Sequence, residues 1–127
     1  MNGAFKDFDI DLKFGQEGEQ WLKMLASEQT IEVKRERDIW AKTGNIVFEV
    51  SCNGVPSGLG ATKSSWWAHI LTINGEPQSV MLFKTDKLKD ALRGMVANKT
   101  VTITDGGDGN RAKIILYPLT NLHLLLQ

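Results

Sequence analysis

Two short segments of the chain alternate apolar and polar residues, and this alternation constrains the fold more than any other feature of the sequence. In residues 29–34, Ile31 and Val33 fall on one face of an extended chain, with Glu32 and Lys34 on the other. In residues 46–52 the apolar face consists of Ile46, Phe48 and Val50. The alternation predicts two strands with apolar faces toward the core, and the connection of roughly ten residues between them predicts a hairpin-like pair.

The remaining patterns predict a mixed set of helices and strands. Apolar spacing predicts helices over residues 16–27 and 86–96, with Thr85 as the N-cap of the second. Thr62 is expected to cap a short helix that carries Trp66 and Trp67. Further strands are expected over the β-branched and apolar segments 79–84, 101–104 and 112–117. This order predicts a small α/β or α+β domain with a mixed sheet.

Length and composition exclude several classes of protein. A chain of 127 residues supports one domain, which we expect to cover residues 1–127. No apolar run is long enough to cross a membrane, and we expect neither a membrane partner nor a secretory signal. One cysteine, Cys52, allows no internal disulfide, and we expect it to be buried rather than nucleophilic. We therefore expect a soluble, cytoplasmic protein.

Charge is balanced overall but unevenly placed along the chain. The 15 basic and 15 acidic residues give a net charge of zero, which argues against binding nucleic acid through bulk charge alone. Acids outnumber bases in residues 1–38, and bases outnumber acids in residues 84–113. Two solvated surfaces of opposite charge would produce this pattern, and so would an acidic cation-binding pocket with a basic surface elsewhere. Composition does not choose between them.

The polar faces of the two alternating segments carry the candidate chemistry. Glu32 and Glu49 fall on these faces, and same-face side chains on antiparallel neighbours approach within about 5 Å. Two carboxylates at that distance suit a hard cation such as Mg²⁺. Lys34 shares its face with Glu32 and is suited to position a nucleophile or to stabilise charge on a phosphate. The commoner alternative is that all three residues form ordinary surface ion pairs.

The order of several motifs carries a family resemblance. Gly15 to Glu19 opens a helix, Glu32-Val33-Lys34 lies on the first strand and Glu49 on the second. Further similar segments are residues 42–45, 56–58, 62–67 and 106–110. Together they resemble the PD-(D/E)XK nuclease superfamily, in particular small phage-type and Holliday-junction-resolvase-like endonucleases. The resemblance runs from about Phe14 to Leu119 and implies a restriction-endonuclease-like fold, a central mixed sheet flanked by helices.

The resemblance also implies a function and a set of site residues. It implies a DNA endonuclease dependent on Mg²⁺ or Mn²⁺, acting as a homodimer, and either bacterial or encoded by a phage. Glu19 matches the helix acid, with Glu17 as the alternative, and Glu32 and Glu49 match the two strand acids that ligate the metal. Glu19 is expected to orient the attacking water or to serve a second ion.

The sequence departs from the family at the position of the motif lysine. Ser51 stands two residues after Glu49, where the family has lysine, so Lys34 is expected to supply the ammonium from the neighbouring strand. A second reading takes Glu32-Val33-Lys34 itself as the acid-x-lysine motif, although no acid-bearing strand then lies between it and the first helix. We prefer the first reading.

DNA contacts are expected from three further residues. Ser57 and Lys63 are placed to touch phosphate, and Trp66 to stack on bases. Of the adjacent Trp66 and Trp67, one is expected in the core and the other partly exposed. His69 and His123 suggest neither a zinc site nor a triad. The alternatives to an enzyme are a nuclease-like protein that binds DNA without cutting it and a phage accessory or protein-interaction module.

Overall fold

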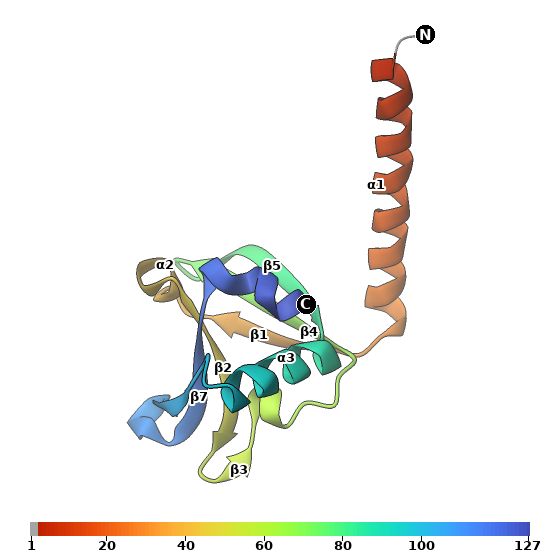
Figure 1. Cartoon of the computed structure of the whole chain (residues 1–127). Helices are drawn as coiled ribbons and strands as arrows, with labels where there is room; N and C mark the ends of the chain where they lie inside the picture. The colour runs from red at the N-terminus through yellow and green to blue at the C-terminus, as the bar shows by residue number, and fades with distance from the viewer. Residues whose placement is uncertain (1–2) are drawn as a thin grey trace. The chain divides into compact units, whose positions relative to one another are not determined.

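The computed structural model describes residues 3–127 and the side chains of residues 12–127. Helix α1 (Gly3–Glu28) forms one compact unit, and Ile31–Gln127 form the second (Figure 1). The predicted helix over residues 16–27 is therefore confirmed as part of a longer one. None of the helices in the described part of the chain is long and apolar enough to cross a membrane. The single domain expected over residues 1–127 stays a prediction.

The strands of the second unit form two sheets. In the first, β1 (Ile31–Glu36) pairs in parallel with β4 (Trp66–Ile73), which pairs antiparallel with β5 (Glu76–Lys84). The second sheet is antiparallel and has the order β3 (Val55–Pro56), β2 (Asn45–Cys52), β7 (Ala112–Pro118) and β6 (Ile103–Gly106). A mixed α and β fold is confirmed, but its strands are divided between two sheets instead of forming one central sheet.

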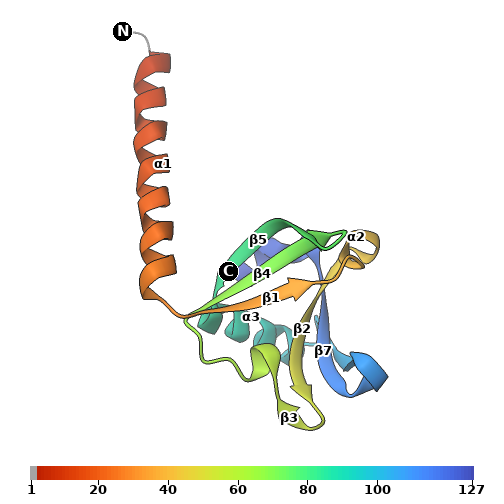
Figure 2. The same ribbon diagram turned by 180° about the vertical axis from the view of Figure 1, so that it is seen from behind.

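The prediction that the first two strands form a hairpin-like pair is wrong. β1 ends and β2 begins beside the short helix α2 (Trp40–Thr43), and the two strands belong to different sheets (Figure 2). Gly44 ends α2 in the left-handed conformation, with φ of 73°, and its N–H donates to the Trp40 carbonyl. A helix with a left-handed C-cap redirects the chain, whereas a hairpin needs a tight turn that returns the chain beside itself.

The short helix expected after Thr62 is also wrong, because Trp66 and Trp67 lie on β4. The Thr62 hydroxyl bonds locally to Ser64 and caps no helix. A central strand covered on both faces is nearly continuously apolar, so its pattern does not separate it from a buried helix. Successive strand residues face opposite ways, and Trp67 is 2% exposed while Trp66 is half-buried, which confirms their predicted division.

The core of the second unit lies between the two sheets and helix α3 (Thr85–Ala97). Its buried members come from β2, β4, β5, β7, α3, the 3-10 segment η1 (Gly58–Gly60) and the C-terminal 3-10 segment η3 (Leu119–Leu126), and include Phe48, Leu59, Trp67, Phe83, Leu88, Ile115, Tyr117 and Leu125. The helix predicted over residues 86–96 is confirmed as α3. Thr85 is its first residue, not its N-cap, and is buried, with its N–H donating to the Ser65 carbonyl. The strands expected over residues 79–84 and 112–117 are confirmed as β5 and β7, and the third begins later, as β6.

Candidate functional site

The charged face of β1 becomes progressively buried along the strand, from the exposed Glu32 to the buried Glu36. Glu36 is only 3% exposed and Lys34 is half-buried, whereas Val33 on the opposite face is 58% exposed. The register places Glu32 and Lys34 opposite Trp67 and His69 of β4, both of which are buried. The expectation that Ile31 and Val33 form the core face of this strand is therefore wrong, since the strand has the reverse orientation.

Buried hydrogen bonds explain why the charged face is turned inward. The Glu36 carboxylate accepts, at Oε1, the backbone N–H of Val47 at 2.5 Å and a bond from His69 Nε2 at 2.8 Å. The Trp67 indole N–H donates to His69 Nδ1 at 3.0 Å. An indole N–H only donates, so His69 Nδ1 is the acceptor and Nε2 carries the proton that goes to Glu36. His69 is therefore held as the neutral Nε2–H tautomer.

This network joins the two sheets at one place. Glu36 lies on β1, His69 and Trp67 on β4, and Val47 on β2. A further bond runs from the buried Thr72 hydroxyl to the Glu36 carbonyl at 2.6 Å. No role was predicted for Glu36 or His69 from the sequence. The signal for Glu36 was present, because it continues the alternation of Glu32 and Lys34 by one more step.

Lys34 differs from Glu36 in having no compensating partner. Its side chain makes no hydrogen bond or ion pair with any of the residues that the structure describes, although it is half-buried between Glu32 and Glu36 on the same strand face. An ordinary surface lysine pairs with a neighbouring acid or extends into water. The ammonium of Lys34 is thus the available cation on this face.

Glu49 and Ser57, both predicted site residues, are brought together. The Ser57 hydroxyl donates to Glu49 Oε2 at 2.7 Å, and its backbone N–H donates to the Val50 carbonyl at 3.1 Å. Gly58 follows with φ of 52°, and a Cβ there would lie 3.0 Å from the Glu49 Cβ. The loop that contains Ser57 and Gly58 therefore packs directly on β2. It lies beside a register shift between Glu49 and Ser51, and such irregularities change the direction in which side chains point.

The remaining predicted residues lie elsewhere. Glu19 is exposed on α1 and pairs with Lys23 at 3.1 Å, while Glu17 pairs with Lys13 at 4.0 Å. Lys63 is exposed in the segment before β4. The Lys84 ammonium lies 5.9 Å from the centre of the Trp66 ring. The roles assigned to Glu19, Lys63 and Trp66 stay predictions.

Glu32 and Glu49 lie on strands of different sheets. They are therefore not the antiparallel neighbours from which their close approach was predicted. Within residues 12–127, no group of three or more His, Cys, Asp or Glu side chains is arranged to hold a metal ion. Mg²⁺ often takes only one or two protein carboxylates, so the donor chemistry of Glu32 and Glu49 still suits it.

Comparison of the chain with family models, curated proteins and solved structures finds no match.

Proposed function

We propose that the chain is a DNA endonuclease dependent on Mg²⁺ or Mn²⁺, with a restriction-endonuclease-like site built on β1 and β2. The observation that carries this proposal is the half-buried Lys34 beside Glu32 on the charged face of β1, without a hydrogen-bond or ion-pair partner among the described residues. Its ammonium is therefore available to an anion such as a phosphate. The alternative of surface ion pairs predicts an acidic partner for Lys34.

In this proposal, each candidate site residue in the second unit has a separate role. A bound metal ion supplies Lewis-acid polarisation of the scissile phosphate and lowers the pKa of a nearby water. Glu32 and Glu49 are the residues that would hold the ion, and the Ser57 hydroxyl fixes the Glu49 carboxylate through Oε2. The Lys34 ammonium stabilises the negative charge that grows on the phosphate oxygens. Glu36 positions β1 against β2.

The wider assignments belong to the same proposal. DNA is the proposed partner, with Ser57, Lys63 and Trp66 contacting phosphate and bases. Glu19 remains the proposed helix acid, and a homodimer the proposed assembly.

Nicking of supercoiled plasmid and of branched DNA by the full chain tests the enzymatic role. With Mg²⁺ or Mn²⁺, Lys34→Met and Glu49→Gln are expected to reduce the rate by about 100-fold or more, as loss of a charge-stabilising group in an active site does. Lys87→Met and Glu76→Gln remove exposed charges outside the site and serve as matched controls. Equal loss of activity in the controls would show that the site is misassigned.

A protein that binds DNA without cutting it is the second candidate, because Ser51 stands where a nuclease of this family has lysine. Binding of DNA without cleavage in either metal would refute the enzyme and support this candidate. Absence of DNA binding at low salt would refute both, and would leave the accessory or protein-interaction module.

A further inference from the structure

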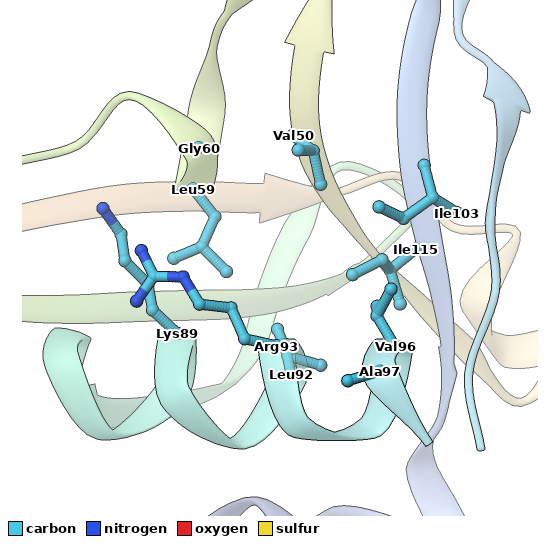
Figure 3. A pocket seen from close by; sticks show the side chains of 10 residues that line it. All are labelled: Val50, Leu59, Gly60, Lys89, Leu92, Arg93, Val96, Ala97, Ile103 and Ile115. Atoms are coloured by element: carbon cyan, nitrogen blue, oxygen red, sulfur yellow. The ribbon is translucent and has the colours of Figure 1, made fainter. Parts of the chain in front are cut away.

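A cavity of about 380 Å³ lies between α3 and the sheet that contains β2, β7 and β6 (Figure 3). Its volume falls in the range of small-molecule sites. Its walls are branched aliphatic side chains from several elements, namely Val50, Leu59, Leu92, Val96, Ile103 and Ile115. The cavity therefore offers an aliphatic surface to an apolar ligand.

The polar groups of the cavity are two cations from one helix. Lys89 and Arg93 are four residues apart on α3, so they are neighbours on its surface. Figure 3 shows both on one side of the cavity, with Val50, Ile103 and Ile115 on the other. Among the described residues, none that lines the cavity is acidic. The charge is thus of one sign and confined to one end.

Both cations retain capacity for a ligand. Lys89 Nζ donates to the Thr62 carbonyl at 2.7 Å, which uses one of the three N–H donors of an ammonium. Arg93 pairs with Asp90 at 3.2 Å, but both side chains are more than two-thirds exposed. An exposed ion pair is weak enough to yield to a ligand.

We propose that this cavity binds an aliphatic anion, with its hydrocarbon chain against the aliphatic wall and its anionic head on Lys89 and Arg93. The aliphatic side of the cavity has no polar side chain, so a nucleobase seated there would bury its polar edge without hydrogen bonds. A neutral hydrocarbon would leave the two cations unused. The proposal concerns a different set of residues from the nuclease site and does not depend on that function.

Titration of the full chain, followed by NMR chemical shifts, tests the class of ligand. Octanoate and octyl phosphate represent carboxylate and phosphate heads, and octanol and octylammonium have the same chain without negative charge. At least one anion is expected to bind more tightly than octanol, and octylammonium most weakly, with shifts at the lining residues. Each methylene added from hexanoate to octanoate is expected to raise affinity about fourfold.

Variants at the charged end separate this site from non-specific binding. Arg93→Gln and Lys89→Gln are each expected to weaken binding of the anion about two- to fivefold and to leave octanol unchanged. Lys87→Gln, on the same helix but outside the lining, is the matched control and is expected to have no effect. Equal affinity for octanol and both anions, shifts confined to other residues, or no saturable binding would overturn the proposal.

Discussion

Removal of the Glu36 carboxylate tests whether the inward face of β1 is as important for stability as its contacts indicate. Glu36→Ala leaves two donors without their acceptor, the buried His69 Nε2–H and the part-buried Val47 N–H. An unsatisfied buried donor costs about 1–3 kcal/mol and a part-buried one costs less, so the two together cost about 2–4 kcal/mol. That loss is a large fraction of the stability of an ordinary small domain.

Two further substitutions, one at Glu32 and one at Glu36 itself, provide a scale for this loss of stability. Glu32→Ala, on the same face of the same strand, removes an exposed carboxylate and is expected to change the free energy of unfolding by less than about 0.5 kcal/mol. Glu36→Gln keeps an acceptor oxygen in place but loses its charge. Because hydrogen bonds to charged groups are the stronger class, an intermediate loss of about 1–2 kcal/mol is expected.

Urea denaturation of the three variants and the wild type, monitored by tryptophan fluorescence, measures these differences. Unchanged slopes with a lower midpoint for Glu36→Ala would report a true loss of stability. If Glu36→Ala were no less stable than Glu32→Ala, the network would not exist and β1 would have its charged face toward water. The proposed role of Lys34 would then lose its structural support.

Two further perturbations test the packing and the ionisation of the second unit. Gly60→Ala is expected to destabilise the fold in urea denaturation because the new Cβ would lie 2.0 Å from the Val50 carbonyl oxygen, whereas Gly94→Ala, with open space, is expected to stabilise α3 by about 0.5–1 kcal/mol. Equal effects would contradict the contact at Gly60. Burial raises the pKa of Tyr117 above its ordinary value of 10.0, and its hydroxyl donates to the Asn121 carbonyl at 2.7 Å. The folded state therefore favours the neutral phenol. This contribution to stability is fully present below the unfolded pKa and is lost as pH rises through the folded pKa. Ultraviolet absorbance of tyrosinate reports this residue alone, since the chain has one tyrosine, and ionisation of the folded protein at the ordinary pKa would contradict the prediction.

The elements that the sequence predicts well are those whose apolar face is also their buried face. Ile46 and Phe48 of β2 are fully buried, and Leu88 and Leu92 of α3 are nearly so, as their spacing indicates. Local periodicity is sufficient in these cases because burial of apolar surface decides the orientation of the element.

The elements predicted wrongly are those whose orientation depends on partners distant in sequence. The orientation of β1 is set by the hydrogen bonds of Glu36 with Val47 and His69, and His69 lies 33 residues away in the sequence. Alternation along a strand contains no information about such partners. The start of β4 was predicted as a helix because a mostly buried, nearly continuously apolar strand has no clear period of its own. The hydrogen bond between Ser57 and Glu49 was also not predictable from local pattern, since it is a loop that places one residue against the other.

The distinction between local pattern and distant partners also applies to the candidate site. Glu36 and Lys34 share the inward face of β1, but the described structure gives hydrogen-bond partners to Glu36 alone. The hydrogen bonds of Glu36 therefore account for the orientation of the strand, and Lys34 is turned inward as a consequence of that orientation. A structural role for Lys34 would require a partner within the fold, whereas a functional role requires an anion brought from outside. The difference is measurable, because replacement of Lys34 by methionine is expected to leave the stability nearly unchanged and to reduce the proposed nuclease activity by about 100-fold or more.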